Sequence, residues 1–282
     1  MAGLSDFVKY LRQRNRDRLA KHRARKRAKN RGSFAVLAIM KNEAMNIDEW
    51  ISHYLDVGAD RIILIDNGST DNTYQKAESW ARSGKVDLVC LPAKHKQASH
   101  YWSALRKFAF RKYDWLLVAD LDEFWFCPDG KTISAKLAEE QFDRIDVIYA
   151  NWQMFGSSGF VDQPSSVRKD FVYRSQGFAS HTITKYVCRT KALKSHRNLG
   201  IHKIIGADSA KTVSDNHNFH LFHYPIQSLE FFQKVKMTRG DANSAQTEHV
   251  RDMEYFRIYD APCTKIDRTL ADLIESGRLG RG

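Results

Sequence analysis

The chain has 282 residues, of which 43% are hydrophobic and 12% aromatic, and a formal net charge of +12 at pH 7. Such a chain is globular and long enough to bury a sizeable core. The charge is concentrated in residues 1–32, which contain 12 Lys or Arg and 2 Asp or Glu, so the remaining 250 residues are almost neutral. This near-neutral remainder argues against nucleic acid as a partner of the folded part.

Residues 1–32 are interpreted as a basic N-terminal arm, and residues 33–282 are expected to form a single domain. The arm begins with apolar residues at helical spacing and continues as a cationic run up to Arg31. A basic segment with a small apolar face can bind an anionic membrane surface, and it can equally remain a solvated tail. We favour membrane contact over nucleic-acid binding.

The four cysteines lie far apart and show no CxxC spacing, which is typical of a reduced, cytosolic protein. No stretch approaches the roughly 20 apolar residues that cross a bilayer. The N-terminus also lacks the apolar centre of a signal peptide. We therefore expect a cytoplasmic protein that can lie peripherally on the inner face of the membrane.

The first half of the predicted domain alternates apolar strands with amphipathic helices. The strands are predicted at residues 34–40, 61–65, 86–91 and 115–119, and the helices at 47–57, 73–82 and 99–112. This alternation predicts an α/β domain whose central sheet is mostly parallel and covered by helices on both faces. After residue 125 the pattern weakens, and we predict strands at 147–155, 185–189 and 219–224 and helices at 229–236 and 266–276.

Two aspartates follow the predicted strand at 115–119. Side chains alternate along an extended backbone, so Asp120 and Asp122 are expected to point to the same side. Two adjacent carboxylates repel unless a cation or a proton lies between them. A hard divalent ion such as Mg²⁺ or Mn²⁺ suits oxygen ligands and leaves positions for substrate phosphates. The pair alone also fits a turn or a helix cap.

Three predicted strands end at polar residues, namely Asn42, Asp66 and Asp120. The carboxyl ends of parallel strands meet at one edge of a sheet, where ligands of α/β proteins bind. The run at residues 66–71 is also rich in turn-forming residues, which offers a simpler explanation of its composition.

An ordered set of motifs resembles the family 2-type glycosyltransferases. The motifs are Ala-Ile-Met-Lys-Asn-Glu-Ala at residues 38–44, Asp-Asn-Gly-Ser-Thr-Asp-Asn-Thr at 66–73 and Asp-Leu-Asp-Glu-Phe at 120–124. Trp-Gln-Met-Phe-Gly-Ser-Ser-Gly at 152–159 resembles a subgroup related to the family 92 enzymes, although Phe160 stands where that subgroup commonly has His. The resemblance covers roughly residues 34–240 and implies the GT-A fold.

The resemblance implies a metal-dependent glycosyltransferase that moves a sugar from a UDP- or GDP-sugar donor to a glycan or glycolipid acceptor, with inversion. In such an enzyme Asp122 would touch the metal, Mn²⁺ or Mg²⁺, and Asp120 would face the donor ribose or a metal-bound water. His223 and His202 are candidates for a further metal ligand. An enzyme of this kind on the cytoplasmic face would serve polysaccharide or glycolipid biosynthesis.

The same resemblance assigns residues to the rest of the donor. Asp66 would meet the nucleoside base or ribose, and Asn42 and Glu43 would line the base pocket. Lys185 and Arg189 lie four residues apart on a predicted strand and could hold the diphosphate together, although a solvated cationic edge explains them equally well.

Inversion by direct displacement needs a carboxylate or imidazole general base, and the spacing of the motifs does not identify it. The candidates are Glu123, Asp162, Asp170 and His181, and we take Glu123 and Asp162 first.

Two other classes of function are open. An aspartyl phosphatase or phosphotransferase fits poorly, because the aspartates follow about the fourth strand and Phe124 occupies a position that usually holds Thr or Val. A non-catalytic adaptor that binds lipid or nucleic acid on a transferase fold is the stronger alternative, and the intact aspartate pair argues against it.

Overall fold

The computed structural model describes residues 16, 18, 31–92, 97–178, 184–238 and 251–280. The described residues from Gly32 onward belong to one compact unit, Gly32–Gly282. Almost all of the predicted basic arm lies outside the described residues. In the ranges that are described, helices long and apolar enough to cross a bilayer are absent.

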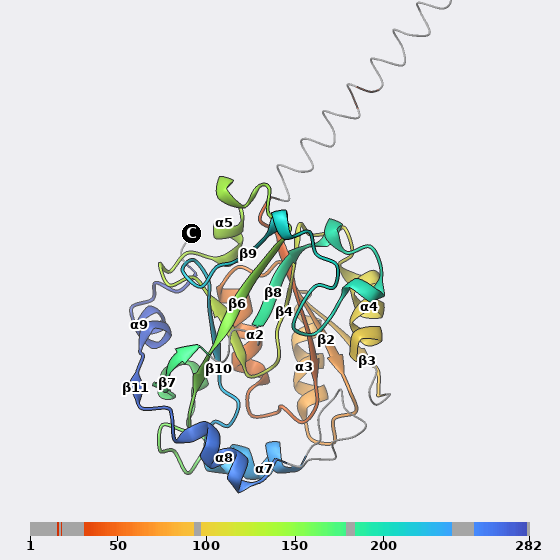
Figure 1. Ribbon diagram of the computed structural model, residues 1–282. Coiled ribbons are helices and arrows are strands. Elements are labelled where there is room, and N and C mark those ends of the chain that lie inside the picture. Colours follow the sequence, from red (N-terminus) through yellow and green to blue (C-terminus); the bar gives the residue numbers. More distant parts are fainter. Residues whose placement is uncertain are drawn as a thin grey trace, which may run out of the picture. The chain divides into compact units, whose positions relative to one another are not determined.

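The first half of the domain is a parallel sheet with helical crossovers (Figure 1). Its strands lie in the order β4-β1-β2-β3, with bounds β1 Phe34–Met40, β2 Arg61–Asp66, β3 Val86–Cys90 and β4 Trp115–Val118. The helices between them are α2 Ile47–Asp56, α3 Thr73–Arg82 and α4 Gln97–Phe108. A parallel pair of strands needs a crossover of this kind, so the predicted alternation and the topology have one cause.

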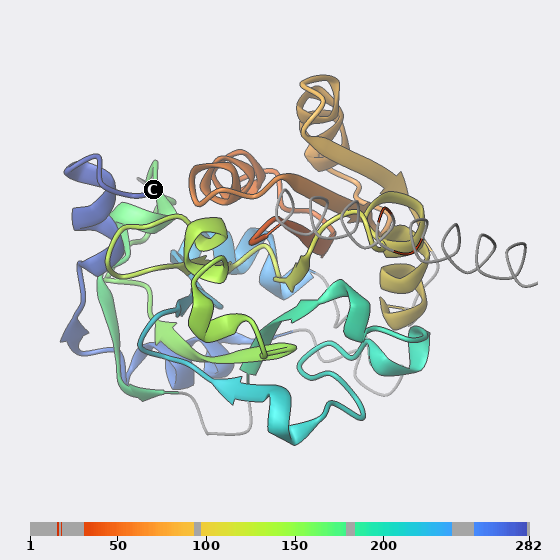
Figure 2. The same cartoon turned by 90° about the horizontal axis from the view of Figure 1, so that it is seen from above.

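Strand β1 shows how the sequence divides the core into two layers. Alternate residues of an extended strand face opposite sides. Phe34 and Val36 therefore pack with Trp50 of α2, whereas Ala35 and Leu37 belong to the cluster that includes helix α4. Figure 2 shows the orange helices α2 and α3 apart from the yellow helix α4. The sheet is thus covered on both faces, as predicted.

The second half of the domain is mixed rather than parallel. Strand β8 (Thr184–Arg189) is antiparallel to both β4 and β6 (Val147–Phe155). The remaining strands are β5 Glu123–Phe126, β7 Tyr173–Phe178, β9 Thr212–Ser214, β10 His220–His223 and β11 Lys265–Ile266. The predicted α/β class is confirmed. Strands β1 to β4 pair in parallel, whereas the other strands combine antiparallel pairs with the parallel pairs that β6 makes with β9 and β10.

Two helices of this second half, α7 Leu229–Lys234 and α9 Thr269–Glu275, lie within the predicted ranges. The sequence patterns missed the short helices α5 Ile133–Leu137, α6 Val167–Asp170 and α8 Met253–Asp260. The described part of this half also contains five 3₁₀ turns, at Glu140–Phe142, Thr190–Ala192, His196–Asn198, Ser209–Lys211 and Lys236–Thr238. Helix α7 begins at Leu229 because the Ser228 hydroxyl accepts a hydrogen bond from the Phe231 amide, which is an N-cap.

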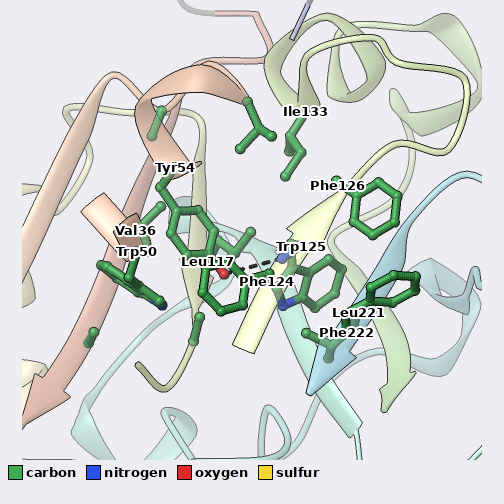
Figure 3. Packing of buried hydrophobic residues seen from close by; sticks show 14 of the residues in the cluster. Val36, Trp50, Tyr54, Leu117, Phe124, Trp125, Phe126, Ile133, Leu221 and Phe222 are labelled. Carbon is green, nitrogen blue, oxygen red and sulfur yellow. Dashed lines mark hydrogen bonds between the residues drawn. The ribbon is translucent and has the colours of Figure 1, made fainter. Parts of the chain in front are cut away.

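An aromatic cluster joins the two halves (Figure 3). Trp50 and Tyr54 project from one face of α2 toward β5, where Phe124 and Trp125 are completely buried. The Trp125 amide donates a hydrogen bond to the Tyr54 hydroxyl, at 3.4 Å. Because β5 directly follows the two aspartates, this cluster also fixes the position of the aspartate turn.

Candidate functional site

Asp120 and Asp122 lie in a tight turn between β4 and β5, at residues 120–123. Strand β4 ends at Val118, so the expected alternation along a strand does not place them. The Glu123 amide donates to the Asp120 carbonyl at 3.1 Å, and the Asp120 amide donates to the Glu123 carboxylate at 2.9 Å. A reciprocal pair of hydrogen bonds within the turn, rather than strand geometry, sets the spacing of the two aspartates.

Helix α2 holds this turn from outside. The Trp50 indole N–H donates to the carbonyls of Asp120, at 2.8 Å, and Glu123, at 3.2 Å. The Tyr54 hydroxyl donates to the same Glu123 carbonyl at 3.0 Å. Buried carbonyls need such partners, and here they come from the helical face that also forms the core. The backbone of the turn is therefore held in place by side chains of α2.

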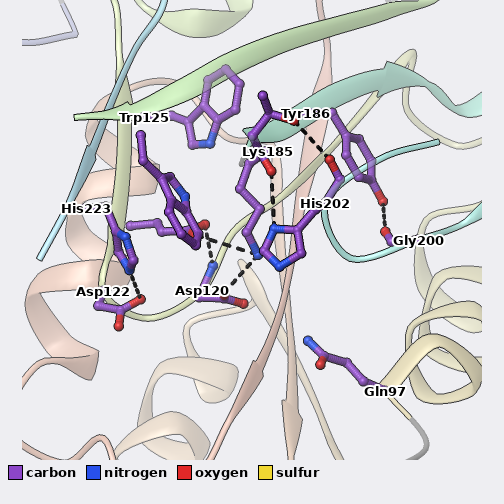
Figure 4. Close-up of polar contacts among 12 residues, drawn as sticks. Gln97, Asp120, Asp122, Trp125, Lys185, Tyr186, Gly200, His202 and His223 are labelled. Carbon is purple, nitrogen blue, oxygen red and sulfur yellow. Dashed lines mark hydrogen bonds and ion pairs between the residues drawn. The ribbon is translucent and has the colours of Figure 1, made fainter. Parts of the chain in front are cut away.

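Asp120 is paired with a buried lysine (Figure 4). The Lys185 ammonium lies 2.8 Å from Asp120 Oδ2 and 3.6 Å from Glu123 Oε1, and the lysine side chain is fully buried. Burial alone would lower the pKa of Lys185, but Asp120 and Glu123 raise it above its ordinary value. Lys185 therefore stays charged and holds Asp120 in place. Trp152 completes the arrangement by donating its indole N–H to Glu123 Oε1, at 2.8 Å.

Glu123 is completely buried, and neighbours engage both of its oxygens. Burial raises its pKa, the ammonium of Lys185 lowers it, and the charges of Asp120 and Asp122 raise it, so that the pKa lies well above the usual range. A carboxylate enclosed in this way has no path to an acceptor hydroxyl. Glu123, predicted as a general base, is better described as a positioning residue of the turn.

Asp122 is paired with a second buried lysine and a histidine. Lys236 Nζ lies 2.5 Å from Asp122 Oδ2, and His223 Nε2 lies 3.5 Å from Asp122 Oδ1. Burial alone would raise the pKa of Asp122, but Lys236 and His223 hold it well below its usual value. Asp122 is thus an ionised carboxylate at the point where the resemblance expects a metal ligand.

Among the described residues, Asp122, Glu123 and His223 offer two oxygens and one imidazole nitrogen within 4.8 Å of one another. Oxygen and imidazole donors suit Mn²⁺. Since both oxygens of Glu123 are engaged, Asp122 and His223 are the side chains that fit a divalent ion best. His202 is not part of this cluster: its Nδ1 faces the Thr184 carbonyl at 3.2 Å.

The indole of Trp152 lies between the two histidines. Its ring centroid is 4.1 Å from that of His223 and 5.6 Å from that of His202. Trp152 therefore orients His223 by ring packing while it supports Glu123 by a hydrogen bond. The sequence placed Trp152 in a family motif but did not indicate this double contact.

The loops after β1 and β2 are joined through Asn42 and Glu43. Asn42 has a left-handed backbone, with φ at 53°, and its side-chain oxygen accepts a hydrogen bond from the Thr70 amide at 2.8 Å. The Glu43 amide donates to the Thr73 hydroxyl at 2.7 Å. The predicted base-binding residues thus also connect the carboxyl ends of two parallel strands.

Asp66 lies at the end of β2, as predicted, and its carboxylate organises the following turn. It accepts hydrogen bonds from the amides of Gly68, at 3.1 Å, and Ser69, at 3.3 Å. The thiol of Cys90, at the end of β3, lies 3.8 Å from Asp66 Oδ2. The turn-forming explanation therefore accounts for these contacts of Asp66, and a donor contact is an additional hypothesis.

Arg189 is not brought to the site. In the register of β4 and β8 it lies opposite Trp115, at the far end of the strands from Lys185. Its guanidinium pairs with Asp114 and donates to the Phe142 carbonyl at 3.0 Å. Lys185 and Arg189 therefore do not hold a diphosphate together, because their shared strand separates them along its length.

The other base candidates are scattered. Asp162 is exposed, in a segment whose Phe160 carbonyl accepts a hydrogen bond from the first amide of α7. Asp170 accepts a hydrogen bond from the Ser166 amide at 3.1 Å, at the end of α6. His181 lies outside the described residues. Of the carboxylates that we predicted, Asp162 is the one whose exposure suits proton transfer.

The Trp-Gln-Met-Phe-Gly-Ser-Ser-Gly segment comprises the last four residues of β6 and a turn that contacts helix α8. The Ser157 amide donates to Asp260 Oδ1 at 2.7 Å. A side chain at Gly156 would approach that same oxygen to 2.6 Å, so only glycine fits there. The glycine is thus explained by close packing, and Trp152 at the start of the segment reaches the site.

Two site residues had no signal in the sequence. Lys236 lies in a 3₁₀ turn 114 positions after its partner Asp122, and lysines in the last turn of a helix are usually solvated. Gln97 begins α4 and donates to the Tyr101 hydroxyl at 2.8 Å, while its Oε1 has no hydrogen-bond partner among the described residues. In Figure 4 the side-chain amide of Gln97 points toward the region of Asp120 and His202.

Comparisons with known proteins agree with the motifs. The family model of glycosyltransferase family 92 matches residues 35–275. A glycosyltransferase family 92 protein of Oryza sativa subsp. japonica is 26% identical over 192 residues, and one of Ricinus communis is 22% identical over 190 residues. These matches span 67% and 66% of the chain but only 30% and 31% of the two relatives.

Solved structures with a similar arrangement include TarS of S. aureus. The complex with UDP-GlcNAc has a TM-score of 0.47 and 14% identity, and it covers 87% of this chain and 71% of that one. The complex with UDP has a TM-score of 0.45 and 15% identity, with coverage of 68% and 60%. The family match itself extends from the second residue of β1 to the last residue of α9, so the chain belongs to glycosyltransferase family 92.

Proposed function

We propose that this protein transfers a sugar from a nucleotide-sugar donor to a glycan or glycolipid acceptor, with inversion at the anomeric carbon. The observation that carries the proposal is the aspartate turn: Asp120 and Asp122 are fixed by buried partners in a chain of a glycosyltransferase family. A turn held by buried side chains in this way is preorganised for binding.

The leaving group of such a reaction is a nucleoside diphosphate, on which negative charge develops as the glycosidic bond breaks. A divalent ion bound there would act as a Lewis acid toward that charge. Asp122 and His223 are the residues that would hold the ion. Trp152 would keep the imidazole of His223 in the orientation that this requires.

Asp120 would face the donor ribose. Its side chain is 34% exposed, and Lys185 pairs with Oδ2. The other oxygen, Oδ1, can then accept hydrogen bonds from the ribose hydroxyl groups. Lys185 acts as a positioning residue and does not itself contact the diphosphate. Asn42, Glu43 and Asp66 would line the pocket of the base at the ends of β1 and β2.

Transfer with inversion requires a base that takes the proton of the acceptor hydroxyl as that oxygen attacks the anomeric carbon. We assign this role to Asp162, because it is an exposed carboxylate on the segment that follows the Gly-Ser-Ser-Gly turn. The anomeric configuration of the product, read by NMR, tests inversion directly.

The deciding experiment is calorimetric titration of UDP and GDP into the protein, with and without Mn²⁺. Wild type is compared with Asp122→Asn, and Asp129→Asn serves as a matched control because Asp129 also pairs with a buried lysine, Lys136, on a different turn. We expect metal-dependent binding of one nucleotide to wild type and the control, and its loss in Asp122→Asn by at least about tenfold. Absence of binding by folded wild-type protein would instead support a non-catalytic adaptor.

A further inference from the structure

The chain places an ammonium group of its own where a divalent ion is expected. Lys236 Nζ lies 2.5 Å from Asp122 Oδ2, and the side chains of the two residues are only 3% and 11% exposed. The ring of Phe231 lies beneath the ammonium, with its centroid 5.6 Å away. This contact is a buried, charge-assisted hydrogen bond, which is a strong interaction when both groups are desolvated.

Both aspartates of the turn are neutralised in the same way. Asp120, which is partly exposed, pairs with Lys185, and the buried Asp122 pairs with Lys236. An isolated buried carboxylate is strongly unfavourable. The two lysines therefore supply positive charge beside both aspartates of the turn.

Lys236 and a divalent ion would compete for the same carboxylate. The ligand atoms of Asp122, Glu123 and His223 lie within 4.8 Å of one another, and Lys236 already occupies one Asp122 oxygen at that cluster. An ammonium and a divalent cation on one carboxylate repel each other in a buried site. The Lys236 ammonium and a divalent ion therefore cannot both bind the Asp122 carboxylate closely.

We propose that Lys236 holds the cation position of Asp122 and that a divalent ion binds by displacing it. This inference rests on the proposed function, because it concerns the metal of the donor site. Helix α7 can stay in place during the exchange, since its first turn is fixed by the Ser228 cap and by the hydrogen bond from the Leu229 amide to the Phe160 carbonyl. Lys236 itself lies beyond α7, in the 3₁₀ turn Lys236–Thr238, so the exchange requires its side chain to turn away from Asp122.

The exchange makes metal binding depend on the donor. The diphosphate of a nucleotide sugar would offer an anionic partner to the ammonium that leaves Asp122. The metal should therefore bind weakly to the free protein and more tightly in the presence of a nucleoside diphosphate. Such coupling is reciprocal, so the metal would strengthen nucleotide binding by the same factor.

The test is titration of the full-length protein with Mn²⁺ alone, with free Mn²⁺ measured by electron paramagnetic resonance. Lys236→Met removes the competing charge and keeps the length of the side chain. Lys234→Met is the matched control, because Lys234 lies two residues away, is exposed and pairs with Glu230. We expect Lys236→Met to bind Mn²⁺ on the order of tenfold more tightly than wild type, and Lys234→Met to be unchanged.

Unchanged or weaker Mn²⁺ binding by folded Lys236→Met would overturn the exchange. If that variant does not fold, Lys236→Gln replaces it, since its amide can still donate to Asp122 without carrying a charge. Calorimetric titration of UDP and GDP into the same samples separates the two hypotheses. If wild type binds a nucleotide but Lys236→Met has the same Mn²⁺ affinity as wild type, the exchange is rejected and the donor site is kept. If wild type binds neither nucleotide, the donor site itself is rejected.

Discussion

The charged side chain of Lys185 is completely buried. The ammonium bridges Asp120 and Glu123 from a strand that is 65 positions distant from Asp120 in sequence. Removing one member of a buried ion pair is costly because its partner keeps a desolvated charge. The geometry of the whole turn therefore depends on this residue, although it makes no contact with solvent.

Replacement of Lys185 by Met should destabilise the protein and distort the turn. We expect the free energy of unfolding to fall by about 3 kcal/mol, because Glu123 and Asp120 lose their common cation. Urea denaturation followed by circular dichroism measures the change. Lys191→Met is the control, since Lys191 is 61% exposed and pairs with Asp146 at the surface. Equal midpoints for the two variants would contradict the structural role of Lys185.

The sequence identified the two aspartates but not the cations that neutralise them. An Asp-x-Asp pair is visible because its members are adjacent, whereas Lys236 reaches Asp122 through tertiary packing alone. Arg189 shows the converse error: a spacing of four residues on a strand suggested a shared function, but the strand is long enough to separate its two ends. Local spacing predicts which face a residue occupies and not how far it lies from a site.

Among the elements, β11 and α9 are joined to β7 by one carboxylate. Asp267 accepts hydrogen bonds from the amide and hydroxyl of Thr269, the first residue of α9. It also pairs with Arg174 of β7, at 2.7 Å. Burial alone would raise the pKa of Asp267, but the hydrogen bonds of Thr269 and the charge of Arg174 lower it.

Asp267→Asn should reduce stability in a pH-dependent manner. The folded-state pKa lies below the unfolded value of about 3.9, so the ionised carboxylate stabilises the fold above that pH. That contribution is lost as the pH falls through the folded-state pKa. We expect the free energy of unfolding of the variant to be about 1–2 kcal/mol lower than that of wild type at pH 7. Below the folded-state pKa of Asp267, the two proteins should be almost equally stable.

Urea titrations at a series of pH values measure this difference, with Asp272→Asn as the control in the same helix. Asp272 is 58% exposed and pairs with Arg268 on the surface. A constant difference between Asp267→Asn and wild type at every pH would show that the carboxylate does not act through its charge.

Elements with a clear hydrophobic period were predicted well. The strand at 34–40, the helix at 73–82 and the strand at 147–155 have the predicted bounds. Strand β5 was missed because its four residues follow the turn directly and are all buried, so they show no alternation. The mixed sheet was missed for a similar reason: short antiparallel strands in the second half depend on distant partners.

At the scale of the whole molecule, most of the net positive charge lies in sequence before the first residue of the described core. Every described core residue lies at position 34 or later, whereas residues 1–32 carry most of the net charge. We therefore expect a chain that lacks residues 1–31 to retain the unfolding midpoint and nucleotide binding of the full-length protein. Differential scanning calorimetry and nucleotide titration on the shortened chain check this expectation.

The same shortened chain tests the membrane hypothesis. Flotation with vesicles that contain anionic lipid should recover the full-length protein and leave the shortened chain behind, because each basic residue near such a surface adds about 1 kcal/mol of attraction. Neutral vesicles are the control. Equal recovery of the two chains from anionic vesicles would reject a membrane role for the arm.

The thiol of Cys90 has a practical consequence. Of the four cysteines, Cys90 is exposed while the others are buried, and its sulfur lies 3.8 Å from the Asp66 carboxylate. Partial burial and the charge of Asp66 raise the pKa of the thiol, so alkylation will be faster in mildly alkaline buffer. A fluorophore attached there, with no other cysteine replaced, would sit beside Asp66 and report occupancy of that edge of the sheet in real time.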